Sequence, residues 1–292
     1  MSIVVIGKSG QLAYELQQAG GDNIVCLGRD DIDITNPAAL AETLDSIRPD
    51  AIINASAYTA VDKAESEPDA AALINTQGVA NLAEYCKANG IFLVHVSTDY
   101  VFNGKKGSPY TVDDTIEPQG VYGKTKADGE KALLNTISDS SCLIRTAWVY
   151  SIHGNNFVKT MLRLMADKPQ LTVIDDQIGS PTLASGLAQA CLFAAQNKTA
   201  GVFHWTDEGV TSWYDFALAI QELAVEKGLL ESKIPVLPIP SSQYPTPAKR
   251  PHYSVLDKTL TRETFSSLQP AHWRAQLSAM LDALKSEQSN EQ

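Results

Sequence analysis

Apolar runs of strand length alternate with stretches of helical spacing along the first half of the chain. Strand-like runs occupy residues 2–6, 23–27, 51–56, 91–97 and 142–150. Helical stretches occupy about 37–47, 65–88, with an irregularity near Gly78, and the region after Tyr122. Short buried runs separated by helices are typical of a parallel sheet covered on both faces. We therefore predict an α/β fold with a doubly wound, Rossmann-type parallel sheet, whose ligands bind outside the carboxyl ends of the strands.

The pattern becomes less regular after Tyr150. Residues 212–227 and about 271–285 have helical spacing, while prolines punctuate 234–240 and 244–251. We expect a Rossmann domain over residues 1–150, which also includes parts of about 179–225, and a smaller mixed C-terminal substrate lobe, mainly 151–292. The chain is expected to cross between the lobes more than once. The polar tail from Ser286 to Gln292 is expected to fray.

A G-x-x-G-x-x-A turn follows the first strand at once. Gly7 allows a tight turn, Gly10 lets a phosphate approach the backbone, and the small Ala13 lets the next helix pack closely on the strand. The N-terminus of that helix then points free N–H groups at a pyrophosphate. An ordinary glycine turn is the alternative. In this strand–turn–helix context, the pattern favours a dinucleotide site.

The end of the second strand bears on which dinucleotide binds, because an acidic residue there usually contacts a free ribose 2′-hydroxyl. This chain reads Gly28-Arg29-Asp30 at that point. An arginine suits a 2′-phosphate, which favours NADPH over NADH. NADH stays possible, because Asp30, Asp31 and Asp33 are all near enough in sequence to contact the ribose or the adenine edge.

A Y-x-x-x-K pattern, Tyr122 and Lys126, follows a strand that ends near Thr98. Residues four apart on a helix share a face, so Lys126 is expected to lower the pKa of the Tyr122 phenol from its usual value of about 10. A tyrosine tuned in this way exchanges a proton with a carbonyl or alcohol oxygen near neutral pH. Thr98 is placed to hydrogen-bond the same oxygen. His95, inside the strand, is interpreted as a packed core histidine.

Composition narrows the range of partners. The 292 residues carry a net charge of −11, which argues against nucleic acid and anionic membrane surfaces as partners. The cysteines are far apart and are interpreted as buried free thiols. No apolar run approaches the ~18 residues that span a bilayer, and the first strand begins too early for a signal peptide. We therefore expect a cytoplasmic protein that binds neither nucleic acid nor membrane.

Eight segments in order along nearly the whole chain resemble one family. They are GKSGQLA from Gly7, NASAYTAVDKAE from Asn54, STDYVF from Ser97, VYGKTKADGE from Val121, RTAWVY from Arg145, NNFVKTM from Asn155, DDQIGSPT from Asp175 and YPTPAKRPHYSVLD from Tyr244. Together they resemble the extended short-chain dehydrogenase/reductases that act on nucleotide sugars, and among these the dTDP-4-dehydrorhamnose reductases. A match of this length and order is highly specific.

The resemblance implies reduction of the C4 keto group of dTDP-4-dehydro-L-rhamnose by NADPH, which gives dTDP-L-rhamnose, a precursor of cell-wall or surface polysaccharide. It implies that Tyr122 is the proton donor, Lys126 its pKa partner and a ribose ligand, and Thr98 the third catalytic residue. The implied cofactor site comprises Gly7, Ser9, Gly10, Gln11, Leu12, Arg29, Asp33, Ile34, Ala55, Ser56, Ala57, Tyr58 and Lys126. The implied substrate site comprises Val61, Thr98, Tyr100, Tyr122, Trp148, Asn156, Gln177, Pro181, Thr182 and Arg250. A planar guanidinium at Arg250 also suits a diphosphate on chemical grounds.

Related enzymes and non-enzymes of the same fold are the alternatives. Nucleotide-sugar dehydratases carry Thr-Asp-Glu where this chain has Thr98-Asp99-Tyr100, so the glutamate needed to eliminate water is missing. Epimerases hold NAD tightly through an acidic residue at the end of strand two, where this chain has an arginine. A non-catalytic regulatory subunit and a reductase of another nucleotide-linked 4-keto sugar stay open. The intact set of catalytic residues argues against the regulatory subunit.

Some relatives are described as dimers bridged by Mg²⁺ through glutamates. Glu15 is present here, but the later positions are Ser185 (or Ala184) and Ala283. A hard cation needs several oxygen ligands. We therefore expect no structural Mg²⁺ and no other metal, a monomer or weak homodimer, and a solvated Glu15.

Overall fold

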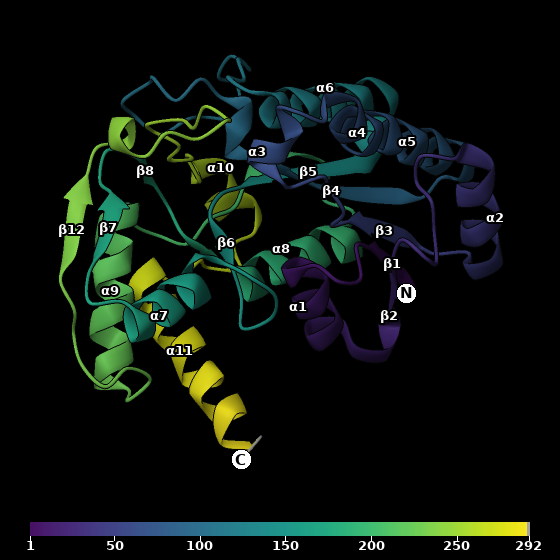
Figure 1. Ribbon diagram of the computed structural model, residues 1–292. Helices are drawn as coiled ribbons and strands as arrows, with labels where there is room; N and C mark the ends of the chain where they lie inside the picture. Colours follow the sequence, from purple (N-terminus) through teal and green to yellow (C-terminus); the bar gives the residue numbers. More distant parts are fainter. Residues whose placement is uncertain (291–292) are drawn as a thin grey trace.

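The computed structural model describes residues 1–290, and a parallel sheet of six strands lies at its centre (Figure 1). The strand order is β10-β5-β4-β3-β1-β2, and every neighbouring pair is parallel. The strands are β1 (Ile3–Ile6), β2 (Ile24–Leu27), β3 (Ala51–Asn54), β4 (Phe92–Thr98), β5 (Ser141–Thr146) and β10 (Gly201–His204). The predicted doubly wound α/β fold is confirmed.

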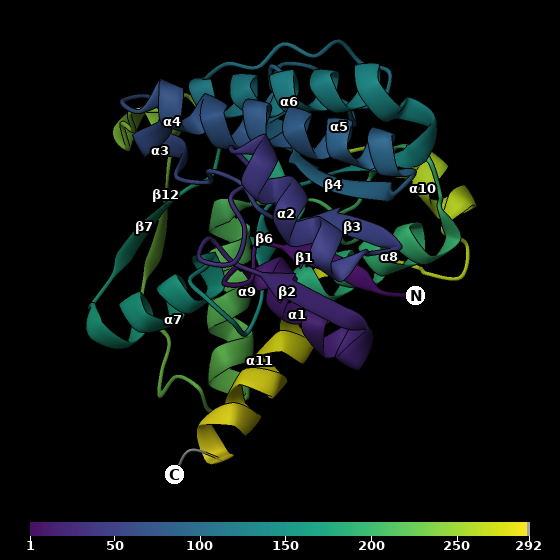
Figure 2. The ribbon, with the colours of Figure 1, turned by 90° about the vertical axis from the view of Figure 1, so that its right-hand side faces the viewer.

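Helices cover both faces of this sheet (Figure 2). One face carries α1 (Gln11–Gly20) and α8 (Ala184–Asn197), and the other carries α2 (Pro37–Ile47), α5 (Gly78–Asn89) and α6 (Val121–Ile137). The chain leaves β1 towards the first face and leaves β3 towards the second. The order of the sheet therefore reverses between β1 and β3, which is where a doubly wound sheet opens a ligand cleft.

The two covered faces explain why the strands are apolar at every position. Ile3 and Val5 of β1 point into the core beneath α1 and α8, where they meet Leu16. Val4 and Ile6 point into the opposite core, which α2, α5 and α6 cover. Successive strand residues face opposite sides. Both sides of β1 are therefore buried, and an uninterrupted apolar run is what this position in the fold requires.

A smaller lobe with its own hydrophobic core lies beside the sheet, at the left of Figure 1. Its main elements are α7 (Phe157–Asp167), β7 (Leu171–Ile174), α9 (Trp213–Glu226), β12 (Val236–Ile239) and α11 (Trp273–Asn290). Shorter elements of the chain are α3 (Val61–Ala64), α4 (Pro68–Ala72), β6 (Val149–Tyr150), β8 (Ile178–Gly179), β9 (Thr182–Leu183), β11 (Thr211–Ser212) and α10 (Thr259–Thr264). Within the described residues, no helix has the length and apolar character needed to cross a bilayer.

The structure breaks a strand that the pattern predicts as continuous, and it confirms the irregularity predicted near Gly78. The predicted strand 142–150 breaks at Trp148, whose φ of 49° is left-handed, and the chain resumes as β6, which pairs with β9. The helical region 65–88 contains a π-helical turn (Leu73–Gln77) directly before Gly78. The tail differs as well, because α11 continues to Asn290 where fraying from Ser286 is expected. The last two residues of that tail lie outside the described part of the chain.

Gly129 of α6 fits closely against the π-helical turn. A Cβ at this position would lie 2.1 Å from the carbonyl oxygen of Asn75, a backbone atom that is held in place by the turn. We expect Gly129→Ala to lower the free energy of unfolding by about 1–3 kcal/mol through overpacking, despite the better helix propensity of alanine. Urea unfolding measures this. The exposed Lys131→Ala on the same helix is the control, with an expected change within about 0.5 kcal/mol. Equal midpoints for both variants would contradict the prediction.

Candidate active site

The glycine turn after β1 is shaped for close approach to a ligand. Gly7 has a φ of 121°, and a Cβ on it would lie 3.0 Å from backbone atoms of Ala55 and Ser56. Helix α1 starts after Gly10, and no side chain in residues 1–290 caps its N-terminus. Ser9 and Gly10 are exposed there. Uncapped N–H groups at an exposed helix start fit the diphosphate of a dinucleotide.

The loop after β3 forms the opposite wall of this turn. Ala55, Ser56, Ala57 and Tyr58 are all half-buried. The backbone N–H and the hydroxyl of Ser56 both donate to Oδ1 of Asn54, at 3.1 and 2.7 Å. A second asparagine, on the π-helical turn, accepts from the Tyr58 N–H at 2.8 Å. The side-chain amides of two buried asparagines therefore hold the loop that is predicted to line the cofactor site.

Two positively charged side chains lie near the end of β2, where the sequence indicates one. Arg29 is exposed, as expected for a side chain that contacts a 2′-phosphate. Lys8 of the glycine turn reaches the same place, with its Nζ 3.6 Å from Asp31 Oδ2. That oxygen also accepts from the Gly28 N–H at 2.8 Å, which lowers the pKa of Asp31. The position of Lys8 within the glycine turn was the sequence signal that could have identified this second cation.

The two residues expected near the adenine differ in accessibility. Asp33 is exposed, and its Oδ1 accepts from the N–H and the hydroxyl of Thr35 at 2.9 and 2.7 Å. These bonds lower the pKa of Asp33 and keep it anionic. Ile34 is buried in the core that α2 and α5 cover, and its carbonyl accepts from Asn81. Asp33 is therefore the one of the pair whose side chain faces solvent.

The predicted catalytic residues meet at the end of β4 and the start of α6. The Thr98 hydroxyl donates to Oδ1 of the buried Asp99 at 2.9 Å, and the rings of Tyr100 and Tyr122 pack edge to face, with centroids 5.5 Å apart. Burial raises the pKa of Tyr122 to about 12, while its hydrogen bond with Thr98 lowers it. Burial also raises the pKa of Asp99 to about 6. The Tyr122 phenol is protonated at neutral pH, which is the form a proton donor needs.

Lys126 departs from the expected role as a neighbour that lowers the Tyr122 pKa. Its Nζ donates to the Val96 carbonyl at 2.7 Å and lies 3.3 Å from Nε2 of His95. No hydrogen bond among the described residues joins Lys126 to Tyr122, and the pKa of that phenol is raised. The physical reason is burial, because a lysine only 2% exposed has to satisfy its donors inside the protein. Burial also lowers the pKa of Lys126 to about 8.

His95 is fully buried, as its interpretation as a core histidine requires, but it also contacts Lys126, the predicted catalytic lysine. Sequence reasoning missed this contact. The available signal was its register, because Asn54 at the end of β3 pairs directly with His95 on β4. Buried polar side chains on adjacent strands need hydrogen-bond partners, and here they bond to each other.

Trp148 stands on the side of the smaller lobe, and its left-handed backbone turns it onto a second tryptophan. Its ring stacks on Trp213, with centroids 3.5 Å apart and an interplanar angle of 9°. The Trp148 ring also lies so close to Gly179 that a Cβ there would be 2.7 Å from it. The Trp148 carbonyl accepts from Thr182, which is buried together with Gln177 and Pro181. Trp213 is a further aromatic residue that sequence reasoning missed.

Asn156 connects the two lobes. Its Nδ2 donates to Gln11 Oε1 at 2.9 Å and to the Ser151 carbonyl at 2.7 Å, and its Oδ1 accepts from the Lys159 N–H at 3.1 Å and caps α7. Glu15 is half-buried and accepts from the Ser151 hydroxyl at 2.6 Å, so the expectation of a solvated Glu15 is wrong.

Within residues 1–290, no cluster of histidine, cysteine, aspartate and glutamate side chains could hold a metal ion.

Arg250 forks onto an aspartate. Its Nη1 and Nη2 donate to Oδ1 and Oδ2 of Asp62 at 3.0 and 2.7 Å. Asp62 follows Val61 at the start of α3, and the ion pair lowers its pKa. The positive charge of Arg250 also acts on the nearby Tyr100 phenol. The structure thus brings Val61, Tyr100 and Arg250 to one region, with Asp62 as a partner that the sequence did not indicate.

Comparison with known proteins places this site in a family. The family described as RmlD substrate binding domain matches residues 1–286. The chain belongs to this family. The dTDP-4-dehydrorhamnose reductase of Escherichia coli strain K12 is 42% identical, over 97% of this chain and 98% of its own length. The family resemblance inferred from the motifs is confirmed.

Solved structures agree with this membership. The family fold recurs in the dTDP-4-dehydrorhamnose reductase of Clostridium acetobutylicum, with a TM-score of 0.91 and 39% identity over 98% of this chain and 100% of that one. The dTDP-4-dehydrorhamnose reductase of Bacillus anthracis, solved in complex with NADP, has a TM-score of 0.90 and 33% identity over 97% of this chain and all (100%) of that one. A Thermus thermophilus UDP-glucose 4-epimerase shares the fold alone, at 16% identity and a TM-score of 0.80.

Proposed function

We propose that this protein is an NADPH-dependent reductase that converts dTDP-4-dehydro-L-rhamnose to dTDP-L-rhamnose. The observation that carries the proposal is a protonated phenol, Tyr122, beside the Thr98 hydroxyl, at the same sheet edge as an uncapped helix start after a glycine turn. Relatives with 42% identity over nearly the whole chain are dTDP-4-dehydrorhamnose reductases, which supports the same substrate.

The proposed cofactor site fits a phosphorylated dinucleotide. The exposed start of α1 would bind the diphosphate, and Ala55 to Tyr58 would line the other side. Arg29 and Lys8 would meet a 2′-phosphate, which favours NADPH while leaving NADH possible, and Lys126 would bind the ribose. When bound, NADPH supplies the hydride that reduces C4 of the sugar. A relative with 33% identity was solved with NADP, which supports this preference.

The chain's own residues handle the proton. Thr98 would orient the keto oxygen at C4 by turning its one hydroxyl hydrogen from Asp99 Oδ1 to that oxygen. Tyr122 would donate its phenolic proton to that oxygen as negative charge develops on it. A positive charge on Lys126 would then stabilise the phenolate. The sum is a carbonyl that gains one hydride and one proton and becomes an alcohol.

The proposed substrate site takes its shape from both lobes. The Trp148 face, fixed by Trp213 behind it, is a natural platform for a sugar ring. Arg250 would bind the diphosphate. The cofactor part would comprise residues 1–150 with parts of about 179–225, since α8 covers the central sheet and β10 belongs to it. The rest of 151–292 would mainly bind substrate. We infer a cytoplasmic monomer or weak homodimer without metal, nucleic acid or membrane partner.

The first experiment follows NADPH oxidation by the purified protein, with dTDP-4-dehydro-L-rhamnose generated in situ. NADH and a UDP-linked analogue run beside it. Rapid turnover of the dTDP sugar, with NADPH preferred, is the expected result. Binding of NADPH without turnover would contradict the proposal and favour a regulatory subunit of this fold or a different 4-keto sugar.

Arg250→Met is expected to raise the KM for the dTDP sugar by about 10–100-fold, with a much smaller change in kcat. A hydrogen-bonded charge contributes about 1.5–3 kcal/mol, and the diphosphate is bound equally before and during the reaction. Steady-state kinetics measures both constants. Lys249→Met is the matched control, because it removes the neighbouring cation, whose Nζ contacts Gln119 on the surface. Equal KM values for the two variants would remove Arg250 from the site.

A further inference from the structure

A buried chain of polar groups runs beneath the cofactor-site loop to the catalytic lysine. Ser56 donates to Asn54 Oδ1, Nδ2 of Asn54 lies 3.1 Å from Nδ1 of His95, and Nε2 of His95 lies 3.3 Å from Nζ of Lys126. Asn54, His95 and Lys126 are 1%, 0% and 2% exposed, so water does not compete for these bonds. Lys126 closes the chain by donating to the Val96 carbonyl at 2.7 Å.

The donors and acceptors along this chain have one consistent direction. The Ser56 backbone N–H can only donate, so the Asn54 atom that it contacts is the carbonyl oxygen. The amide nitrogen of Asn54 therefore faces His95 and donates to Nδ1. Burial lowers the pKa of His95 well below its usual range, so the ring is neutral. A neutral ring that accepts at Nδ1 carries its hydrogen at Nε2.

That hydrogen points at Nζ of Lys126. An ammonium group has donors only, so it would oppose the Nε2–H of His95. An uncharged amine has one lone pair, which accepts from His95, while one of its own N–H groups donates to Val96. The hydrogen bonds of Lys126 Nζ are therefore those of an uncharged amine.

We propose that Asn54 and His95 are positioning residues that dock Lys126 in its uncharged form, so that gaining a proton releases the lysine towards Tyr122. The meaning of that release rests on the proposed function, in which the lysine charge stabilises the phenolate. The docking itself does not, because it is a property of the buried chain. His95 thereby becomes part of the active-site machinery.

Several charged or titratable groups around Lys126 affect its pKa. Its own helix α6 contributes Tyr122 and Glu130, and the Glu130 charge raises the pKa of Lys126. Arg145 of β5 neutralises that carboxylate at 2.8 Å, which weakens the effect. From β4 and the turn after it come His95 and the buried Asp99, the latter on the Tyr122 side. Burial outweighs these charges and lowers the pKa of Lys126 to about 8, so both forms are accessible near neutral pH.

The first test needs only the native protein. Ring ¹⁵N spectra give the tautomer of His95, and ¹³Cε spectra of labelled lysine follow the titration of Lys126, with assignments from His95→Gln and Lys126→Arg. The expected result is a neutral Nε2–H ring and a Lys126 midpoint at least one pH unit, roughly tenfold in proton affinity, below the usual value of about 10.4. An Nδ1–H tautomer, or an ordinary Lys126 midpoint, would overturn the proposal.

The second test reverses the direction of the hydrogen bonds in this buried network. In Asn54→Asp, one carboxylate oxygen still accepts from Ser56, and the other accepts from Nδ1–H of His95. Nε2 then presents a lone pair to a charged Lys126, so the midpoint is expected to rise by about one pH unit or more, a tenfold gain in proton affinity. Loss of packing alone would not raise the Lys126 midpoint.

The control for the second test adds His95→Phe to Asn54→Asp. This double variant keeps the new carboxylate and the ring shape but removes both ring nitrogens. The rise is expected to disappear. An equal rise would mean that the carboxylate acts directly through its charge, which would overturn the role of His95. Neither titration depends on turnover, so an inactive enzyme and a failed docking model give different results.

Discussion

Tyr122→Phe is expected to lower kcat by about 10²–10⁴-fold and to leave the Kd for NADPH nearly unchanged. The change removes one oxygen, and proton transfer by a positioned acid contributes about this factor. The ring stays, so its edge-to-face packing on Tyr100, at 5.5 Å between centroids, is kept. Steady-state turnover and a fluorescence titration with NADPH measure the two quantities.

Tyr100→Phe is the matched control for this experiment, because it removes a phenol from the ring that packs against Tyr122. Burial raises the pKa of that phenol too, but it does not bond to Thr98 in the way that the Tyr122 phenol does. We expect a much smaller loss of kcat. A Tyr122→Phe enzyme that kept most of its rate would show that another group donates the proton.

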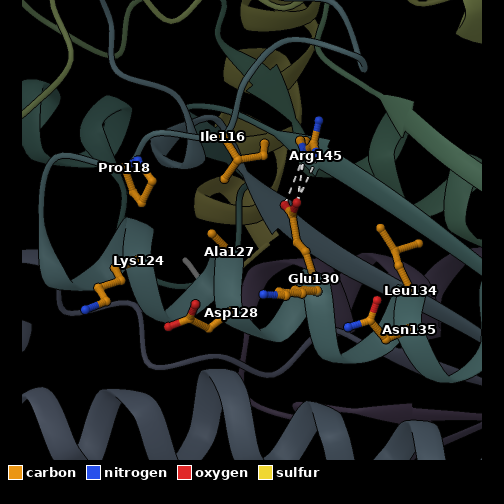
Figure 3. A pocket seen from close by; sticks show the side chains of 10 residues that line it. Ile116, Pro118, Lys124, Ala127, Asp128, Glu130, Leu134, Asn135 and Arg145 are labelled. Carbon is orange, nitrogen blue, oxygen red and sulfur yellow. Dashed lines mark hydrogen bonds and ion pairs between the residues drawn. The ribbon is translucent and has the colours of Figure 1, made fainter.

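Arg145→Met is expected to lower the free energy of unfolding by about 3–5 kcal/mol, the cost of leaving a buried charge without its partner. Nε and Nη2 of Arg145 donate to the Glu130 carboxylate at 2.8 to 3.2 Å, and both side chains are 4% exposed (Figure 3). The guanidinium also donates to the Val112 carbonyl and lies over the Phe102 ring. Urea unfolding measures the loss.

The double variant Arg145→Met with Glu130→Met is the control. Replacing both partners with apolar side chains leaves no buried charge, so most of the lost stability is expected to return. The neighbouring groove along α6, of about 590 Å³, makes this a sharp test, because Glu130 and Arg145 both line it (Figure 3). A single variant that lost less than about 1 kcal/mol would mean that water from the groove hydrates the abandoned carboxylate.

Features that depend on neighbours in sequence were predictable. The run Ile3–Ile6 is apolar because both of its faces are covered, and the glycine turn after it follows from local geometry alone. The placement of Thr98 at the same sheet edge as the glycine turn followed from the rule that the ends of parallel strands share one edge. These features need only the identities of adjacent residues and the direction of the chain.

Features that depend on distant partners were not predictable. Arg250 was identified as a cation for phosphate, but Asp62, its partner, is 188 residues away in sequence. The direction of the Lys126 side chain followed from His95 and Val96 on another element, and not from the spacing to Tyr122. The Trp148 ring stacks on Trp213 of α9, which is distant in the sequence. A pattern contains no information about such pairs until the fold brings them together.

The bonds from Asn156 to Gln11 and from Ser151 to Glu15 have a kinetic consequence. Both fasten helix α1, whose first turn would face the proposed diphosphate site, to the segment that starts α7. A dinucleotide bound at α1 would thereby also stabilise this edge of the proposed sugar site. Substrate binding would then follow a compulsory order, in which the dinucleotide binds before the sugar nucleotide. A dead-end analogue of the sugar nucleotide would therefore be an uncompetitive inhibitor with respect to the dinucleotide.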